Sequence, residues 1–319
     1  MNAVGMPATG ANQSKRKPMR KLLAVLLSVI ALSASAKETI NITYAFGVGD
    51  AMSNYDRALV EELNRTQDKY SFIFDVKPGA GNAIAANYVK NTPNTILATS
   101  GAFWVRPVFY PNESYNTADF KGILPQCSDA MSIASTKFKT MKDVPTDRPL
   151  NIAVTGLGVV SHLIAVKFTE KYPNTLIVPY KSPTDAITAL LSGQVDFAIG
   201  YVGDQENWGA GKYAINILGV TGNKPVNGHP TLTSVGLAKL LEESDNPNQF
   251  FVPATWTDEK YKEIRAMLVK ASASKIVRDA YAVNYCRSLD QMSDKDMQAW
   301  FENQDKHWKK LSSGVKVNQ

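Results

Sequence analysis

Short apolar runs alternate along the chain with longer segments in which apolar residues recur every three or four positions. Residues 39–44, 71–76 and 96–99 form short runs rich in Ile, Val, Thr and Phe, which predict buried β-strands. Residues 55–63 and 84–90, which lie between these runs, have the spacing of helices with one apolar face. This order of strand and helix predicts an α/β fold with largely parallel sheets.

A second series of the same kind follows the polar, proline-containing stretch 142–149. The helix that begins at Pro183 has the clearest boundaries, since Ser182 suits an N-cap and Gly193 the position after the helix. Two further helices are predicted near the C-terminus. The remaining predicted elements of this series are strands 150–154, 175–178 and 195–199 and helix 160–171.

Two such series predict two lobes. We place residues 37–135 and 250–319 in the first lobe and residues 136–249 in the second. In open α/β sheets, ligands bind beyond the carboxyl ends of the strands, so a site is expected where the loops of both lobes meet.

The N-terminal segment predicts export. Five basic residues between Lys15 and Lys21 precede the apolar run 22–32, and Ala34-Ser35-Ala36 follows it. This pattern is typical of a secretory signal peptide, residues 1–36, with cleavage after Ala36 and a periplasmic mature protein. A membrane anchor is the alternative, but the run is shorter than the roughly 20 apolar residues that span a bilayer.

Charge and cysteine content narrow the function further. The whole chain has a net charge of +6, but residues 37–319 hold 30 basic and 29 acidic side chains. No basic cluster remains, so a nucleic-acid partner is not expected. Cys127 and Cys286 are the two cysteines, and they form either a disulfide or two buried thiols.

Catalytic motifs are absent from the sequence. The three histidines, His162, His229 and His307, are scattered, and no zinc-binding, C-x-x-C or G-x-S-x-G pattern occurs. We therefore expect no metal, no cofactor and no enzymatic activity. A secreted hydrolase that uses Ser161 or Ser100 with His162 remains an alternative, although adjacent helical residues do not face each other.

Glycines follow several predicted strands. Phe46-Gly47-Val48-Gly49, Gly79-Ala80-Gly81-Asn82, Ser100-Gly101 and Thr155-Gly156-Leu157-Gly158 each place small residues and backbone N–H groups near a helix start. Such positions favour anions. Each segment alone is also compatible with an ordinary tight turn, but four of them together predict an anion-binding cradle.

Three segments carry a family resemblance. Residues 178–196 contain VPYKSPTD and LLSGQVD, residues 77–86 read KPGAGNAIAA, and residues 155–163 read TGLGVVSHL. They resemble the VPYKG…LLAGQVD, RPGAGGNIGA and GSSGNGSSQHL segments of the substrate-binding receptors of tripartite tricarboxylate transporters, the Bug or TctC-like proteins.

The resemblance implies a type II periplasmic-binding-protein fold, in which two α/β lobes joined by two crossing strands close over a ligand. It implies a receptor, expected to act as a monomer, that passes a small carboxylate to membrane permease subunits. A sensor that presents its ligand to a membrane histidine kinase is the alternative. The ligand-binding residues implied by matching the motifs are Phe46, Gly47, Gly49, Thr155, Gly156, Gly158, Ser161 and His162, with Ser100 and Gly101 as further candidates.

The first loop departs from the family pattern. Asp50 interrupts the glycine run, and Ser53 stands where the family has an aspartate. A carboxylate at this position would repel an anionic ligand unless it points away or binds an ammonium group. The aromatic residues Phe103, Tyr180 and Tyr201 lie near predicted loop ends and either line a pocket or pack between elements.

Overall fold

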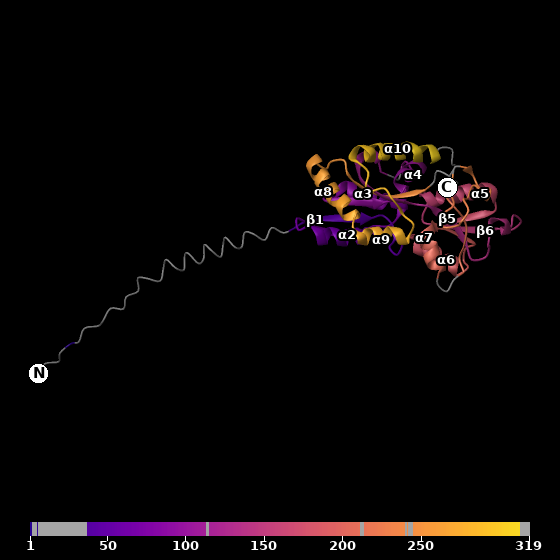
Figure 1. Cartoon of the computed structure of the whole chain (residues 1–319), viewed down its shortest axis with the longest axis horizontal. Helices are drawn as coiled ribbons and strands as arrows, with labels where there is room; N and C mark the ends of the chain where they lie inside the picture. Colours follow the sequence, from indigo (N-terminus) through magenta and orange to yellow (C-terminus); the bar gives the residue numbers. More distant parts are fainter. Residues whose placement is uncertain are drawn as a thin grey trace. The chain divides into compact units, whose positions relative to one another are not determined.

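The computed structural model describes Met1, Gly5 and residues 37–112, 115–210, 214–239, 241 and 245–312 (Figure 1). The predicted signal peptide lies outside these residues apart from Met1 and Gly5, so its cleavage site stays a prediction. The chain divides into one unit of Met1–Glu38 and another of Thr39–Gln319. Within the described part, no helix has both the length and the apolar composition of a membrane span.

The first lobe is built on a six-stranded mixed sheet, in the order β11-β4-β10-β3-β1-β2. β1 runs parallel to β3, whereas β10 is antiparallel to both of its neighbours, β3 and β4. The strands are β1 (Glu38–Tyr44), β2 (Tyr70–Val76), β3 (Thr95–Thr99), β4 (Phe120–Asp129), β10 (Asn246–Pro253) and β11 (Arg287–Ser288).

Helices cover both faces of this sheet (Figure 1). Side chains of α2 (Ala51–Thr66), α8 (Asp258–Ser272) and α9 (Lys275–Val283) pack in one buried apolar cluster. Side chains of α3 (Ala83–Asn91), α4 (Ala102–Phe109) and α10 (Asp294–Ser312) pack in another. Short 3-10 turns occur at η1 (Ala80–Asn82) and η2 (Thr117–Asp119).

The second lobe contains a five-stranded sheet in the order β7-β6-β8-β5-β9. β6 is parallel to β7 and β8, and β5 is antiparallel to β8 and β9. Its elements are β5 (Met131–Ser135), η3 (Met141–Asp143), β6 (Leu150–Val154), α5 (Val160–Lys171), β7 (Thr175–Pro179), α6 (Pro183–Leu191), β8 (Phe197–Tyr201), α7 (Val202–Gly209) and β9 (Asn216–Val220).

The predicted α/β architecture is confirmed, but the chain changes sheet at places that the sequence does not mark. β4 and β5 are separated only by Ala130, yet they belong to different sheets, and β10 starts in the first sheet at Asn246. The predicted lobe boundaries lie after residue 135 and before residue 250. In the structure, the chain leaves the first sheet after Asp129 and returns to it at Asn246. The pattern of residues 123–135 reads as one strand, because no glycine and no Asn-Gly or Asp-Gly pair marks a break at residue 130.

A disulfide joins Cys127 in β4 to Cys286, immediately before β11. The two Cα atoms lie 5.5 Å apart and the residues are separated by 159 positions in the sequence. Of the two alternatives that the sequence left open, the structure has the bridge. It attaches the segment after α9 to the strand that leads into the second lobe.

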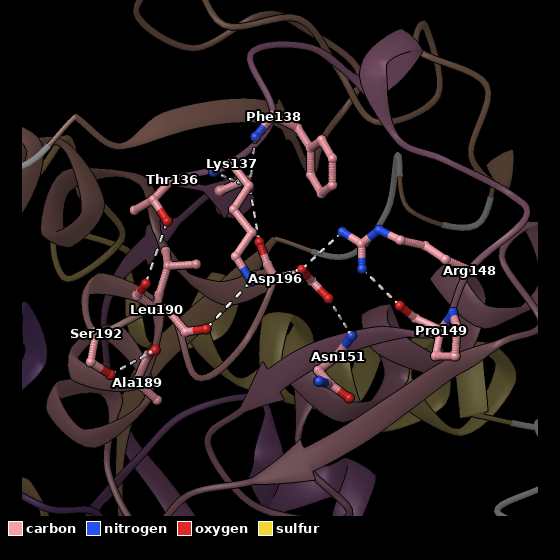
Figure 2. Close-up of polar contacts among 12 residues, drawn as sticks. Thr136, Lys137, Phe138, Arg148, Pro149, Asn151, Ala189, Leu190, Ser192 and Asp196 are labelled. Atoms are coloured by element: carbon pink, nitrogen blue, oxygen red, sulfur yellow. Dashed lines mark hydrogen bonds and ion pairs between the residues drawn. The ribbon is translucent and has the colours of Figure 1, made fainter.

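Asp196 organises the second lobe beside the start of β6 and β8 (Figure 2). Its Oδ1 accepts from Lys137 Nζ at 2.9 Å and from Arg148 Nη2 at 3.1 Å, while Oδ2 accepts from the Asn151 backbone N–H at 2.9 Å. Burial alone would raise the pKa of the Asp196 carboxyl, but the bonds from Lys137, Arg148 and Asn151 hold it below its usual value. The aspartate that ends the LLSGQVD segment therefore has a structural role.

Replacing both cysteines by serine should lower the free energy of unfolding by about 2–4 kcal/mol, because the unfolded chain regains the entropy that the cross-link removes. Guanidinium unfolding of the mature protein measures this difference. Reduced wild-type protein is the control and should match the variant. Equal stability of all three forms would contradict a stabilising bridge.

The Asp196→Asn variant should be less stable by about 1–3 kcal/mol at neutral pH, because it loses hydrogen bonds to a charged group. A carboxyl with a lowered native pKa contributes stability above its unfolded pKa and loses it as the pH falls through the native pKa. The difference should therefore begin to shrink near pH 4, the usual pKa of an aspartate, and vanish once the pH is below the lowered native pKa. Thermal unfolding at several pH values tests this, and a difference that persists in acid would contradict it.

Candidate functional site

Two cavities lie between the lobes. The larger has walls from both sheets. The smaller adjoins it at Asp50, Pro183 and Gly200, which line both. The larger is lined by Tyr44, Phe46, Asp50, Ser100, Met131, Thr155, Val159, Val160, Ser161, Pro183, Gly200, Tyr201 and Asn246. The smaller is lined by Gly49, Asp50, Pro183, Thr184, Ala186, Ile187, Ala198, Ile199, Gly200, Asp204, Gln205 and Trp208.

Asp50 occupies the centre of this region and does not point away from it. It is the N-cap of α2, where its Oδ1 accepts from the Ser53 backbone N–H at 2.9 Å. Its Oδ2 accepts from the Tyr44 hydroxyl at 2.5 Å. The residue is only 3% exposed, and this burial raises the pKa of its carboxyl, against the opposing effect of the Tyr44 hydrogen bond. The loop thus uses its unusual aspartate to start the helix.

A second carboxylate approaches from the other lobe. Asp204, in the first turn of α7, accepts the Ala51 backbone N–H at 2.9 Å through Oδ1. Backbone N–H groups in the first turn of α2 therefore donate to carboxylates from both lobes. The partial positive charge at a helix N-terminus favours this arrangement. The other oxygen, Oδ2, is buried and has no hydrogen-bond partner among the residues that the structure describes. Burial, followed by the charges of Asp50 and Asp129, raises the pKa of Asp204 well above its usual value.

Three amides of the predicted anion cradle donate to nearby side chains. The Thr155 N–H donates to Ser161 Oγ at 3.1 Å, and the Gly158 N–H donates to His162 Nδ1 at 3.1 Å. The Gly49 N–H donates to Ser53 Oγ at 3.1 Å. Four residues that carry hydroxyl groups, Ser100, Thr155, Ser161 and Tyr201, are among those that line the larger cavity. Gly156 and Gly158 have φ values of +119° and +74°, which explains glycine there without an anion.

The predicted site residues divide into two groups. Five of them, Phe46, Ser100, Thr155, Ser161 and Tyr201, line the larger cavity, and Gly49 lines the smaller. The others, Gly47, Ser53, Gly101, Phe103, Gly156, Gly158, His162 and Tyr180, are not among the lining residues. Contact of any of them with a solute remains a prediction.

Several of the residues outside the cavities have evident structural roles. Phe103 stacks on Phe251 in the core, with ring centroids 3.8 Å apart. The Gly101 N–H donates to Asn246 Oδ1 at 2.9 Å. Tyr180 packs beside the apolar cluster beneath α6. These roles follow from contacts distant in sequence, so the local pattern did not separate them from pocket residues.

Ser161 and His162 do not form a nucleophile and base. Ser161 Oγ lies 3.0 Å from Thr155 Oγ1, and His162 Nδ1 accepts from the Gly158 N–H. Burial, together with the nearby charge of Arg106, lowers the pKa of His162 to about 4, so its ring is neutral at physiological pH. The geometry thus gives the hydrolase alternative no support.

A polar chain that the sequence analysis missed connects the two lobes. Asn246 donates through Nδ2 to the Tyr201 hydroxyl at 3.0 Å, and that hydroxyl donates to Asn248 Oδ1 at 3.1 Å. Asn248 Nδ2 in turn donates to Asp129 Oδ2 at 3.3 Å. No local signal distinguishes these asparagines in β10. Asp204 could have been found, since it follows the buried strand β8 at its carboxyl end.

The lobes are in close contact at both ends of the cavities. On one side, Arg106 Nη1 donates to the Leu157 carbonyl at 2.8 Å. On the other, Asn207 Nδ2 donates to Asn284 Oδ1 at 3.2 Å. A Cβ atom built on Gly203 would lie 2.6 Å from Asn284 Cα, so α7 and the end of α9 pack backbone to backbone. These contacts define a closed arrangement.

The sequence matches the profile described as Tripartite tricarboxylate transporter family receptor over residues 57–315. A curated relative from Pseudomonas sp. (strain P51), the UPF0065 protein in the tcbD-tcbE intergenic region, is 26% identical over 217 residues. That similarity covers 64% of this chain and 63% of the relative, so the chain spans less than two thirds of that relative's length.

Solved structures share the fold. The periplasmic binding protein BugD aligns with a TM-score of 0.78 and 22% sequence identity. The alignment covers 88% of this chain and 98% of the BugD chain. An R. palustris protein solved with adipate has a TM-score of 0.76 at 21% identity, covering 87% and 97%. MatC from Rhodopseudomonas palustris, solved with bound malate, has a TM-score of 0.76 at 16% identity, covering 86% and 99%. The predicted periplasmic-binding-protein fold is therefore confirmed.

A Gly203→Ala variant should be unable to reach the closed arrangement, since its added methyl would meet the Asn284 backbone at 2.6–2.8 Å. We expect a larger radius of gyration in small-angle scattering, with each lobe still folded. Gly209→Ala is the matched control, because it lies on the same helix and its nearest neighbour is Ile215 of the same lobe. Identical scattering of the Gly203 variant and the wild type would contradict this closure contact.

Proposed function

Because this chain belongs to the tripartite tricarboxylate transporter receptor family, whose members are non-enzymatic solute-binding proteins, we propose that it captures a small carboxylate in the periplasm and delivers it to a membrane permease of the tripartite type. The observation that carries this proposal is the pair of adjoining cavities enclosed between the lobes. Closing two lobes over a solute by hinge motion is a familiar mode of capture.

The larger cavity suits a carboxylate. Hydroxyl groups of Ser100, Thr155 and Ser161 belong to residues of its wall, and they come from both lobes. Hydroxyls donate hydrogen bonds to a carboxylate, and such bonds are stronger than those between neutral groups. Two relatives with this fold were solved with adipate and malate, which are both dicarboxylates, and this supports the same ligand class here.

Solute capture requires only that the closed form binds better than the open form. The difference in affinity between the two forms sets how far a ligand shifts the equilibrium. Contacts from both walls exist only when the lobes are together, so each wall hydroxyl contributes to closure as well as to binding. The permease would then recognise the closed, loaded receptor.

We expect the mature protein, from Lys37, to be stabilised by one or a few members of a panel of succinate, malate, adipate, citrate, benzoate and amino acids. A ligand present at about 100 times its Kd adds about 2.7 kcal/mol to the free energy of unfolding. Thermal unfolding measures the shift, and chromatography of the recovered ligand shows whether it is unchanged.

A Ser100→Ala variant should bind the identified acid at least about tenfold more weakly, since it loses a wall hydroxyl worth roughly 1.5 kcal/mol. Ser192→Ala, at an exposed position that follows α6 and lines neither cavity, is the matched control and should bind as the wild type does. Binding of no acid by a ligand-free preparation would overturn the proposed function.

A further inference from the structure

We propose that the solute, a carboxylate on the function proposed above, also carries a protonated nitrogen, and that Asp50 and Asp204 from opposite lobes hold it. The ligand class is therefore a zwitterion such as an amino acid, rather than a simple di- or tricarboxylate. Asp50 and Asp204 are the residues that would determine this specificity.

Acidic side chains, and no basic ones, line the two cavities. Asp50 and Asp204 are the ionisable acids on the walls of the smaller cavity, and neither cavity has a lysine, arginine or histidine among its lining residues. A dianion would enter a space with no opposing charge and with two carboxylates. A protonated amine supplies the missing countercharge, and its attraction is strong in a site with little water.

Asp204 has a carboxylate oxygen that could accept a hydrogen bond from the ammonium group of a ligand. Its Oδ1 is engaged by the Ala51 N–H, but its buried Oδ2 has no partner among the described residues. A buried carboxylate oxygen without a hydrogen bond is costly, and a donor from a ligand would remove that cost. Each carboxylate oxygen of Asp50 accepts one hydrogen bond, from Tyr44 and Ser53, and has the capacity for another.

Closure of the two lobes brings two acidic side chains together, and a cation between them would be stabilising. Asp50 belongs to the loop before α2 and Asp204 to α7, so they approach each other only when the lobes meet. The charge of Asp50 is among the causes that raise the pKa of Asp204, after burial. An ammonium group between them would offset this repulsion, so a ligand that carries one would favour the closed form.

The surroundings suit an organic cation better than a metal ion. Calcium takes six to eight oxygen ligands, and the smaller cavity offers two carboxylates beside Ile187, Ile199 and Trp208. Among the described residues, the one group of three potential ligands within 4.8 Å is Cys127, Asp129 and Cys286, whose sulfurs are bonded to each other. Trp208 provides an aromatic wall of the kind that attracts alkylammonium groups.

The two cavities differ in their lining, and this difference would set the orientation of a bound ligand. Asp50 lines both, so the amine would lie near it and Asp204, and the carboxylate would extend toward the hydroxyls of the larger cavity. The hydroxyls of Ser100, Thr155 and Ser161 would bind this end. One ligand could therefore contact the acidic and hydroxyl-lined ends at once.

Calorimetric titration with matched acid pairs tests the inference. The probes are succinate and aspartate, glutarate and glutamate, and adipate and 2-aminoadipate, applied to mature protein freed of co-purified solute by reversible unfolding with the disulfide intact. We expect at least one amino acid to bind at least tenfold more tightly than its amine-free partner. Equal or tighter binding of the amine-free acids overturns this inference and leaves the proposed function intact, whereas binding of neither class overturns both.

The Asp204→Asn variant isolates the charge, because an asparagine oxygen can still accept from the Ala51 N–H. It should lose at least tenfold in affinity for the preferred amino acid and should reduce the preference over the amine-free partner to about threefold or less. Asp185→Asn, on an exposed helix position that lines neither cavity, is the matched control and should retain both values. An unchanged preference in a folded Asp204 variant would overturn the assignment.

Discussion

Everything at the site depends on the chain passing twice between two sheets. β4 continues into β5 after a single residue, and the return to β10 brings the second lobe back to the first. The strands of each lobe then end facing the other lobe, so loops that are far apart in sequence form common walls. The disulfide attaches the end of α9 to β4 next to this crossing, and that end also contacts α7.

Two carboxylates bind the start of α2, one through a local capping interaction and one through a tertiary contact. Asp50 is an ordinary N-cap by local criteria, and Tyr44 and Ser53 satisfy its oxygens. The second lobe then buries it and adds Asp204 to the same helix terminus. A residue that stabilises a helix in the open lobe thereby becomes part of an unusually acidic wall in the closed protein. This dual use explains how the first loop can depart from the family pattern without loss of the fold.

The glycine-rich loops have a structural role that their sequence did not show. Their positive φ angles and internal hydrogen bonds, as at Gly158 and His162, build rigid turns that present Thr155 and Ser161 to the cavity. The sequence correctly placed these turns after strands. It could not show that the Thr155 and Gly158 amides donate to Ser161 and His162, because these acceptors lie on the following helix and their orientation depends on the folded turn.

The sequence by itself determined the alternation of strands and helices, the family resemblance and the helix start at Ser182, because periodicity and capping act over a few residues. Five predicted pocket residues line the larger cavity, since strand ends converge in any open α/β sheet. Tertiary structure alone decided that Cys127 meets Cys286, that Phe103 stacks on Phe251 in the core, and that Asp204 accepts from the Ala51 amide at the start of α2. Each of these contacts joins residues that are more than a hundred positions apart, and only the packing of complete lobes fixes such distances.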